Sequence, residues 1–330
     1  MKFPFDVERE LLLKKPAKTD PRYGTFPDKR PLLEHINLGV VNLDKPPGPT
    51  SHEVVAWVKK ILNLRIAGHS GTLDPKVTGV LPIMLGDATK AVGALLEAGK
   101  EYICAMRLHR QVSEKKIREV FKEFTATIYQ RPPLKSAVKR EIRMRKIYYM
   151  DILEIQGRDV LFKVGCEAGT YVRKLCHDLG EALGSGANMS ALRRTRSGSF
   201  KEDKTLVKLH ELKDAYIIWQ EEGEESLLRR IILPMEYALE HLPKIYIRDT
   251  AVDAICHGAD LAVPGVVSLE SKIARGDQVA IFTLKGEAVA LGIAQLSSDE
   301  ILKSRDGIAV NSKRVIMPLG IYPKGWTSAK

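Results

Sequence analysis

The sequence predicts an α+β protein with two domains and a short N-terminal extension. The chain has 330 residues, which is long for one domain and comfortable for two. Residues 36–241 mix helical stripes with apolar runs of strand length, and after Pro243 only short strands are indicated. We therefore expect an extension over residues 1–35, a larger mixed domain over 36–241 and a small β-rich domain over 242–330.

The first half of the larger domain alternates between strand and helix. A strand is expected over residues 38–43, because the turn sequence DKPPG follows it directly. Thr50 and Glu53 have the spacing of a capping box, and apolar residues recur behind them at helical intervals. The apolar run over 80–85 has the length of a strand, and residues 88–96 form a helical pattern.

The second half of the larger domain continues with strands and closes with helices. The periodicity favours the following elements: strands over 102–108, 148–155 and 160–166, a helix over 171–183, and a helical pair around 217–241.

The C-terminal residues have the pattern of a small barrel, and the N-terminal residues have the pattern of an extension. Strands over 278–283 and 288–295 are joined by the short turn LKGE. Residues 1–35 are polar and contain Pro16, Pro21, Pro27 and Pro31, so we expect them to lie outside a core.

Composition narrows the class of partner. The chain holds 52 Lys and Arg against 41 Asp and Glu, and its net charge of +11 favours nucleic acid over a membrane. The four cysteines form no C-x-x-C pair, so we expect reduced thiols and no zinc site. No segment has the roughly 20 apolar residues of a membrane span, and the N-terminus lacks the apolar block of a signal peptide. A cytoplasmic protein without a metal site is expected.

The most informative segment is GHSGTLDPKVTG, residues 68–79. Its one carboxylate, Asp74, precedes Pro75, which disfavours helical geometry at Asp74. The glycines on either side allow a bound partner to approach the backbone closely. Such a loop presents a carboxylate in a defined direction and could make it a nucleophile. The alternative is an ordinary turn residue, because Asp-Pro beside glycine is common turn chemistry.

This segment resembles the signature of the TruB/dyskerin family of pseudouridine synthases. Further matching blocks occur in the family's order: NLDKPPGPTS at 42–51, GKEY at 99–102, GTYVRKL at 169–175 and LRRTRSG at 192–198. The resemblance implies a mixed-sheet catalytic domain and a small β-barrel-like PUA domain, onto which the N-terminal extension packs. The given sequence has no long lysine-rich tail, and in this it resembles archaeal members of the dyskerin branch.

The resemblance also implies a catalytic site. In the family, the aspartate that corresponds to Asp74 attacks uridine, Arg173 lies beside it, and Tyr102 stacks on the target uracil. No cofactor is needed. Arg173 lies two positions before Leu175, about 200° around a helix, and so points away from the apolar stripe and could clamp Asp74. A solvated arginine and a core tyrosine are the alternatives.

Other positions match the family's substrate pocket. Tyr171 and Leu192 correspond to lining residues, although each could be ordinary packing. His69 corresponds to a histidine that helps to hold an extruded base, and its alternative is a side chain bonded by the loop backbone. Lys45 is expected to support the loop rather than to touch the substrate, and His177 is expected to be structural.

Two segments are expected to bind RNA. The basic run RPPLKSAVKREIRMRK, 131–146, resembles the family's thumb loop, which closes over RNA; its candidate contacts are Lys135, Lys139, Arg140, Arg143 and Arg145. The stretch HGADLAVPG resembles the RNA-contacting segment of a PUA domain, which reads the ACA end of a guide RNA; its candidates are Gly258, Asp260, Leu261, Pro264 and Gly265. A solvated charge run and a strand turn are the alternatives. Arg193, Arg194 and Arg196 form a second basic cluster.

The function implied is isomerisation of uridines in rRNA and transfer RNA by the catalytic subunit of an H/ACA ribonucleoprotein. The resemblance implies a guide RNA and three small partner proteins: one of glycine-arginine-rich type, one zinc-ribbon protein of small nucleolar type, and one kink-turn-binding ribosomal-type protein. Two alternatives are a stand-alone transfer-RNA pseudouridine synthase and a catalytically silent RNA-binding scaffold. The joint presence of Asp74, Tyr102 and Arg173 argues against the scaffold.

Overall fold

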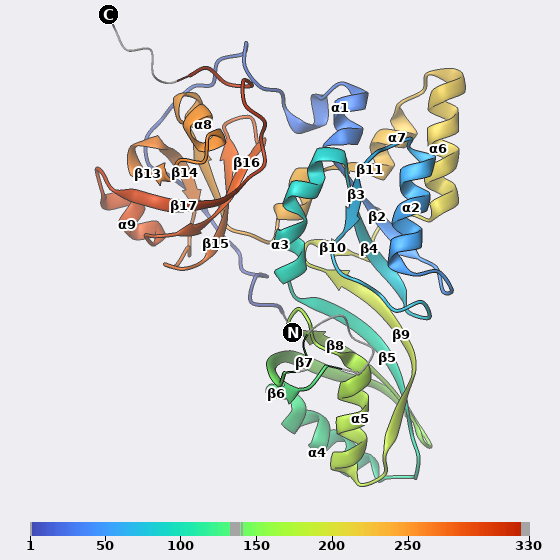
Figure 1. Ribbon diagram of the computed structural model, residues 1–330. Coiled ribbons are helices and arrows are strands. Elements are labelled where there is room, and N and C mark those ends of the chain that lie inside the picture. Colours follow the sequence, from blue (N-terminus) through green and yellow to red (C-terminus); the bar gives the residue numbers. More distant parts are fainter. Residues whose placement is uncertain (1, 133–138, 140, 325–330) are drawn as a thin grey trace, which may run out of the picture.

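The computed structural model describes residues 2–132, 139 and 141–324, and its fold is α+β with two mixed sheets (Figure 1). The α+β class and the mixed sheet of the larger domain are thereby confirmed. Figure 1 shows the C-terminal domain beside the upper half of the larger domain, whose lower half extends away from it.

The larger domain is built on a ten-stranded sheet in the order β11-β2-β4-β9-β5-β8-β7-β6, with β3 paired to β4 and β10 paired to β9. The pair β4·β9 is parallel, whereas β5 is antiparallel to both of its neighbours. The long strands β5 and β9 run from the upper to the lower half (Figure 1). The strands are β2 (Gly39–Lys45), β3 (Ala67–His69), β4 (Thr78–Leu85), β5 (Lys100–Leu108), β6 (Thr127–Gln130), β7 (Arg143–Gln156), β8 (Asp159–Cys166), β9 (Ala187–Ser197), β10 (Phe200–Lys201) and β11 (Ile232–Pro234).

Separate hydrophobic cores form under the helices of the two halves. The upper core contains the buried stripe of α2, and the capping box expected at Thr50 and Glu53 is present. The lower core lies between the sheet and the pair α4 and α5. The helices of this domain are α1 (Leu32–Asn37), α2 (Ser51–Ile61), α3 (Val92–Glu97), α4 (Glu114–Phe124), α5 (Val172–Leu183), α6 (Leu209–Glu222) and α7 (Ser226–Ile231).

Two helical expectations need correction. The segment expected as one helix over 88–96 begins as a 3₁₀ turn, Gly86–Ala91, and only then continues as α3. The helical pair expected around 217–241 is α6 and α7, followed by strand β11 and a second 3₁₀ turn, Met235–Leu239. The chain extends at β11 because Ile232 pairs with Val41 and completes the edge of the sheet beside β2.

The C-terminal domain contains a seven-stranded sheet in the order β1-β14-β12-β15-β16-β17-β13. Its core holds the inward side chains of these strands and of α8. The strand expected at Gln278–Thr283 is observed with those bounds. The elements are β1 (Leu11–Leu13), β12 (Lys244–Ile247), α8 (Asp249–Cys256), β13 (Leu261–Ala262), β14 (Val266–Glu270), β15 (Gln278–Thr283), β16 (Ala288–Ala294), α9 (Ser298–Lys303) and β17 (Ile308–Val315).

The N-terminal segment contacts both domains. Strand β1 pairs antiparallel with β14, so it forms an edge of the C-terminal sheet. The expectation that this segment lies outside a core is wrong at Phe3, which is 2% exposed. Phe3 packs edge-on against Tyr149 of β7, and the Arg196 guanidinium lies 5.0 Å from its ring centroid. The segment therefore ties the sheet of one domain to the other.

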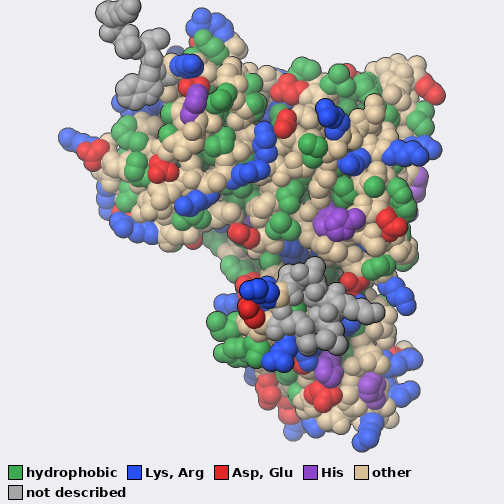
Figure 2. Space-filling model, in the orientation of Figure 1, with side chains coloured by type: hydrophobic (Ala, Val, Ile, Leu, Met, Phe, Trp, Pro, Cys, Tyr) green, Lys and Arg blue, Asp and Glu red, His purple; other side chains and the backbone are tan. Residues whose placement is uncertain are grey.

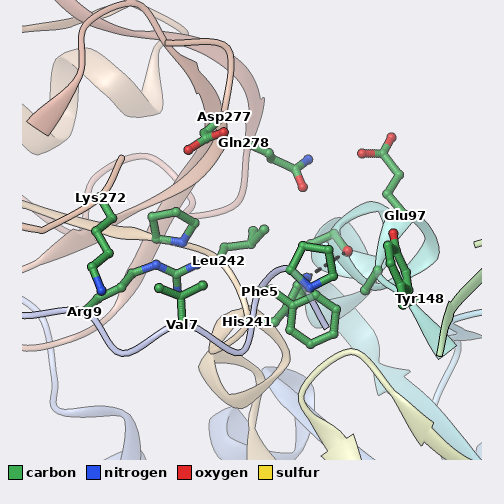
Figure 3. Close-up of a pocket in the computed structure, with 15 residues that line it drawn as sticks. Phe5, Val7, Arg9, Glu97, Tyr148, His241, Leu242, Lys272, Asp277 and Gln278 are labelled. Carbon is green, nitrogen blue, oxygen red and sulfur yellow. Dashed lines mark hydrogen bonds between the residues drawn. The ribbon is translucent and has the colours of Figure 1, made fainter. Parts of the chain in front are cut away.

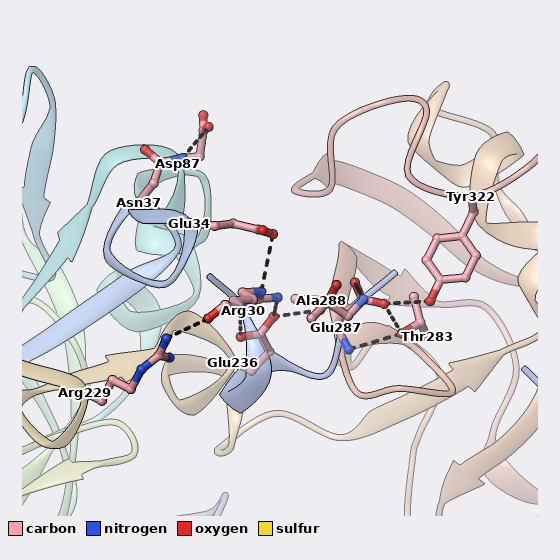
Figure 4. Close-up of polar contacts among 11 residues, drawn as sticks. Arg30, Glu34, Asn37, Asp87, Arg229, Glu236, Thr283, Glu287, Ala288 and Tyr322 are labelled. Carbon is pink, nitrogen blue, oxygen red and sulfur yellow. Dashed lines mark hydrogen bonds and ion pairs between the residues drawn. The ribbon is translucent and has the colours of Figure 1, made fainter. Parts of the chain in front are cut away.

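A buried ion pair joins the same three parts of the chain (Figure 4). Arg30 is 4% exposed and donates to both carboxylate oxygens of Glu236, at 3.0 and 2.7 Å. Glu236 in turn accepts a hydrogen bond from the backbone N–H of Ala288 in β16. One carboxylate thus links the N-terminal segment, the larger domain and the C-terminal domain.

Within the described residues, the helices are too short or too polar to cross a membrane.

Candidate active site

The loop that carries Asp74 connects β3 to β4 and is anchored on both sides of the carboxylate. Leu73 and Val77 are each 3% exposed and belong to the upper core. The buried hydroxyl of Ser51, in the first turn of α2, accepts from the N–H of Leu73 at 2.9 Å and donates to its carbonyl at 3.1 Å. The backbone before Asp74 is therefore held by a single side chain, and Asp74 itself stays exposed.

Lys45 holds the other side of the loop. Its ammonium group is fully buried and donates to the carbonyl oxygens of Pro46, Pro75 and Val77, at 2.9–3.0 Å. Burial lowers the pKa of Lys45, and the Asp74 carboxylate partly offsets that effect. The expectation that Lys45 supports the loop is confirmed.

Asp74 forms an ion pair with Arg173, and more than half of each side chain is exposed. Arg173 lies in the first turn of α5, whose buried face includes Leu175, so the arginine points away from the lower core as expected. The two residues are 99 positions apart. The pair joins a loop of the upper half of the sheet to a helix of the lower half.

Tyr102 and Leu192 lie where the two cores of the larger domain meet. Each is partly buried and packs against both clusters. They come from the neighbouring strands β5 and β9, in which Tyr102 is opposite Arg194 and Cys104 is opposite Leu192. Burial raises the pKa of the Tyr102 phenol, and the positive charge of Arg194 partly offsets the rise.

Sequence reasoning placed Arg194 only in a basic cluster, whereas the structure brings it to the candidate site. Its side chain is 1% exposed; Nε donates to the Val80 carbonyl at 2.7 Å, and Nη2 donates to the Gly71 carbonyl at 3.0 Å. Tyr102 lies directly opposite Arg194 on β5, so the two side chains share a face of the sheet. The neighbouring Lys100 donates to three carbonyls at the end of α3, and burial lowers the pKa of Lys100 to about 7.

The arginines of the basic cluster at 193–196 have partners within the protein or are buried. Arg193 is bound by the carboxylates of Asp44 and Glu202, and Arg196 is bound by Asp6. Arg194 is buried. Strand β9 is central in the sheet, so its arginines turn to partners within the protein.

His69 lies on β3, just before the Asp74 loop. Its Nδ1 accepts from the Gly71 N–H at 3.3 Å, and its ring packs edge-on against His52, with 5.0 Å between centroids. Burial lowers the pKa of His69 to about 4, so the ring is neutral at neutral pH. The loop backbone thus bonds one ring nitrogen.

Gln130, which sequence reasoning did not single out, connects the base of the expected thumb loop to Tyr171. Gln130 ends β6 and is 1% exposed. Its Oε1 accepts from the N–H of Tyr171 at 2.9 Å, and its Nε2 donates to the carbonyl of the same residue at 3.2 Å. Tyr171 directly precedes α5, so this clamp lies two residues from Arg173.

The residues expected in the thumb loop have different surroundings. Lys135 and Arg140 lie outside the described residues, and Lys139 is exposed. Arg143 and Arg145 begin β7. Arg145 turns toward the loop before α5, with its Nη1 at 3.8 Å from the Glu167 carboxylate. Figure 2 shows Lys and Arg side chains spread over both domains on the face in view.

The residues expected to bind RNA in the C-terminal domain also differ in exposure. Gly258 is exposed with φ of +90°, and Pro264 is exposed. Asp260 is exposed, but its carboxylate accepts from the Ser312 N–H at 2.8 Å and so braces β17. Leu261 is 1% exposed in the core, so only its backbone can meet a ligand. Gly265 is partly buried and packs closely, since an added Cβ would lie 3.1 Å from Leu261.

Pro264 borders a basic groove of about 420 Å³. The charged side chains that line this groove are all cationic. They come from the two residues after β1, the residue before α8, the last residue of α9 and the segment after it: Lys14, Lys15, Arg248, Lys303 and Arg305. Sequence reasoning did not find the groove because its cations come from three distant segments.

A second cavity, of about 490 Å³, lies between the two domains (Figure 3). Phe5, Tyr148 and His241 line one side, and Arg9 and Lys272 line another. Asp74, Tyr102 and Arg173 do not line it, so it is separate from the candidate active site. In the described part of the chain, no group of three or more His, Cys, Asp and Glu side chains could hold a metal ion.

Family models match almost the whole chain. The model for the TruB family pseudouridylate synthase N-terminal domain matches residues 59–172, and that for the tRNA pseudouridylate synthase B C-terminal domain matches 173–240. A PUA domain model matches 243–316, and a DKCLD domain model matches 1–55.

Relatives and solved structures agree with these models. A "Probable tRNA pseudouridine synthase B" of Methanosarcina acetivorans is 62% identical over 99% of this chain and 96% of its own length. One of Pyrococcus furiosus is 61% identical over 98% of this chain and 95% of its own length. The structure of a Cbf5-Nop10-Gar1 complex matches with a TM-score of 0.92 and 61% identity, covering 97% of this chain and 98% of that one. An H/ACA RNP bound to a substrate RNA containing 2′-deoxyuridine matches with a TM-score of 0.91 and 58% identity, covering 99% of this chain and 100% of that one.

Proposed function

Because the chain belongs to the TruB/dyskerin family of pseudouridine synthases, we propose that Asp74 is the nucleophile with which it converts uridine to pseudouridine in RNA. The reaction breaks the bond between the ribose and the glycosidic nitrogen, and the uracil then rotates and is rejoined through carbon five. A covalent intermediate divides such a reaction into easier steps. Attack on the anomeric carbon, attack on the ring and abstraction of a sugar proton all require an ionised, accessible carboxylate beside the uridine.

The ion pair of Asp74 with Arg173 is the observation that carries this proposal. A guanidinium favours the charged form of a carboxylate that it contacts. Ser51 and Lys45 hold the loop backbone on either side of Asp74, so the carboxylate is presented in a defined direction although it is exposed. A catalytic group that is already in position before the substrate binds can act without reorganisation.

We place the target uracil against Tyr102, with Leu192, Tyr171 and His69 around it. Tyr102 and Leu192 are partly buried at the meeting of the two cores, and they leave ring and methyl surface for a base. Stacking of a base on an aromatic ring contributes roughly 1–3 kcal/mol. His69, neutral because burial lowers its pKa to about 4, can support an extruded base without adding charge.

The RNA backbone is proposed to contact the thumb segment and the C-terminal domain. The thumb contacts are Lys135, Lys139, Arg140, Arg143 and Arg145, and those of the PUA domain are Gly258, Asp260, Leu261, Pro264 and Gly265, with Leu261 acting through its backbone. The cationic groove beside Pro264 supports the second set, because five positive side chains without an acid suit phosphates.

The proposed substrates are uridines of rRNA, chosen by an H/ACA guide RNA, and uridines of transfer RNA. The relatives' names refer to transfer RNA, and the similar solved structures are H/ACA complexes. By the same comparison, we propose Nop10-like and Gar1-like proteins as partners. The family resemblance adds a kink-turn-binding ribosomal-type protein to this proposal. A stand-alone transfer-RNA enzyme remains the second candidate because of the relatives' names.

The exchange Asp74→Asn tests the catalytic assignment. We expect pseudouridine formation to stop while RNA affinity changes by less than threefold, because the amide keeps the size of the carboxylate and loses its nucleophilicity. Measurements would be pseudouridine content by mass spectrometry and RNA affinity by filter binding. Asp214→Asn, on the exposed face of α6, is the matched control. Retained activity would remove Asp74 from the chemistry, and loss of RNA binding together with the fold would make it a turn residue.

A modification assay with and without guide RNA and partners separates the candidate functions. We expect the protein alone to modify transfer RNA and the complete particle to modify guided rRNA uridines. Activity on transfer RNA alone, unchanged by guide and partners, would identify the stand-alone enzyme. RNA binding without modification of either RNA would identify the scaffold.

A further inference from the structure

Arg194 is unusual among the arginines of the described chain, because it is buried without a carboxylate partner. It is 1% exposed, and no ion pair within the described residues includes it, whereas its neighbours Arg193 and Arg196 are each bound by acids. Burial lowers the pKa of the Arg194 guanidinium. Taking an unpaired charge out of water costs several kcal/mol, and an apolar side chain of similar volume is often at least as stable in such a place. The position therefore calls for a role beyond packing.

The contacts of Arg194 converge on the groups proposed to act on the substrate. Nη2 binds the carbonyl of Gly71, three residues before Asp74, and Nε binds Val80 in the strand that follows the loop. On the neighbouring strand β5, Tyr102 is directly opposite Arg194, so the two side chains lie on the same face of the sheet. One rigid side chain thus binds both ends of the Asp74 loop and lies beside the tyrosine.

The chemistry of the guanidinium determines the direction of the tyrosine's proton. A guanidinium has five donors and no acceptor, so the Tyr102 oxygen can only accept from it. The phenolic proton must then point away from Arg194. Polar contacts of this kind are often long in unliganded enzymes and tighten when the substrate binds.

We propose that Arg194 is a positioning residue for Tyr102: its bonds to the carbonyls of Gly71 and Val80 hold the guanidinium in place, and the guanidinium turns the proton of the Tyr102 hydroxyl toward the uracil. This rests on the proposed function, because it needs Tyr102 to face the substrate. Arg194 itself does not touch the RNA. It acts through Tyr102, so its effect on the reaction depends on that hydroxyl.

A double-mutant cycle tests the dependence. The variants are Arg194→Lys, Tyr102→Phe and their combination, and the readout is the single-turnover rate of pseudouridine formation at saturating enzyme. We expect Arg194→Lys to lose 10-fold or more and the double variant to be within about threefold of Tyr102→Phe alone. Losses that multiply would overturn the proposal, because Arg194 would then act independently of the hydroxyl. Arg196→Lys changes a partly buried arginine of the same strand that binds Asp6; it is the control and should stay near the wild-type rate.

The pH dependence of the rate supplies a readout that a purely structural role does not move. Removing the cation in Arg194→Met should displace the alkaline limb of the profile to higher pH, because the positive charge that favours the phenolate is lost. Arg194→Lys keeps a positive charge and should displace the alkaline limb less. It replaces Arg194→Met in this test if the methionine variant does not fold. An alkaline limb that stays in place in the folded variants would overturn the proposal.

The cycle also distinguishes failure of this proposal from failure of the proposed function. Full activity of Tyr102→Phe would overturn both the proposal and the placement of the uracil against Tyr102. A large loss in Tyr102→Phe, combined with multiplying losses in the double variant, would overturn the role of Arg194 alone. The role of Asp74 is tested separately by Asp74→Asn.

Discussion

Several buried cations in this protein are hydrogen-bonded to backbone carbonyl oxygens rather than paired with carboxylates. Lys45, Lys100 and Arg194 are at most 5% exposed. Lys45 and Arg194 bind carbonyls around the Asp74 loop, and Lys100 binds carbonyls at the end of α3. Lys285, 7% exposed, binds carbonyls of residues 20, 23 and 24 in the N-terminal segment. Most of the carbonyls that they bind belong to loops and helix ends. The net charge of +11 therefore includes charges that hold loops and are not available to RNA.

At the residue scale, Ser51 should matter for activity more than for stability alone. Ser51→Ala leaves the N–H and carbonyl of Leu73 unpaired in a buried place, which costs about 1–3 kcal/mol. We expect that loss in the free energy of unfolding and at least a 10-fold slower reaction, because the backbone before Asp74 is released. Denaturant unfolding and single-turnover rates would measure the two effects.

Ser298 offers a matched control for Ser51. It is also buried, accepts from the Ile273 N–H at 2.8 Å and donates to the Glu270 carbonyl at 3.0 Å, but it lies in the C-terminal domain. Ser298→Ala should lower stability by a similar amount and leave the reaction rate of folded protein near that of wild type. Equal rates for the two variants would mean that Ser51 has no special connection to Asp74.

At the element scale, the hairpin β6–β7 and the loop before α5 form one connected unit. Gln130 at the end of β6 clamps Tyr171, and Glu167 exchanges backbone and side-chain hydrogen bonds with Lys146 of β7. The thumb segment lies between these two strands. A displacement of the hairpin should therefore be transmitted to the start of α5, where Arg173 binds Asp74.

Gln130→Ala should uncouple this unit. The exchange leaves the N–H of Tyr171 without its glutamine acceptor, so we expect the free energy of unfolding to fall by about 1–3 kcal/mol. The reaction rate should fall by more than the loss of folded protein explains, since Arg173 loses its support. Gln295→Ala, which removes one hydrogen bond to Ile293 in the C-terminal domain, is the control. An unchanged rate per folded molecule would show that the clamp serves stability only.

At the scale of the whole molecule, the two domains share an apolar interface as well as polar links. Phe200 and Leu239 of the larger domain belong to one buried cluster with Phe282 and Leu291 of the C-terminal domain. The ion pair of Arg30 with Glu236 adds a link through the N-terminal segment (Figure 4). A shared core of this kind fixes the distance between the groove beside Pro264 and Asp74. An RNA that contacts both would have to span that fixed distance.

Neutralising the groove should weaken RNA binding in a salt-dependent manner. In Lys303→Gln with Arg305→Gln we expect lower affinity and a salt slope shallower by up to about 2, since each phosphate contact contributes roughly 0.7–0.9. Affinity for a guide RNA, measured over a salt series, checks this. The control is Lys204→Gln with Lys213→Gln, which removes the same charge at two exposed positions that do not line the groove. The same slope in wild type and the groove variant would exclude phosphate contacts there.

His241, beside the interdomain cavity, should make stability depend on pH (Figure 3). It is 6% exposed and binds the Ala94 carbonyl at 3.1 Å; burial, with Lys100 and Arg196 nearby, lowers its pKa to about 4. Between pH 6.5 and 4 the unfolded chain binds the proton more readily, so stability is lost as the pH falls. The loss is about 3 kcal/mol at most. The free energies of unfolding of wild type and His241→Gln should differ at pH 7 and converge at pH 4.5. An equal loss of stability in the two proteins between these pH values would contradict the assignment.

Local patterns predicted the elements with strong periodicity and failed where the surroundings decide. The capping box and buried stripe of α2 were readable because both depend on residues within two turns of helix. Strand β9 was not predicted, since its sequence ANMSALRRTRS is polar and only its central place in the sheet explains it. Leu261, expected at an RNA surface, is in a core because β13 pairs with β17 at that point.

The sequence by itself determined the α+β class and the loop that presents Asp74, because both depend on neighbours in the chain. The family resemblance also implied that Arg173 meets Asp74, 99 positions away. Only the tertiary structure decided that Arg194 binds the loop from the central strand. It also decided that Arg193 and Arg196 are paired internally, and that five cations from distant segments form one groove. The partner of a charged side chain is set by the carbonyls and carboxylates that folding brings beside it, and residue order does not record these.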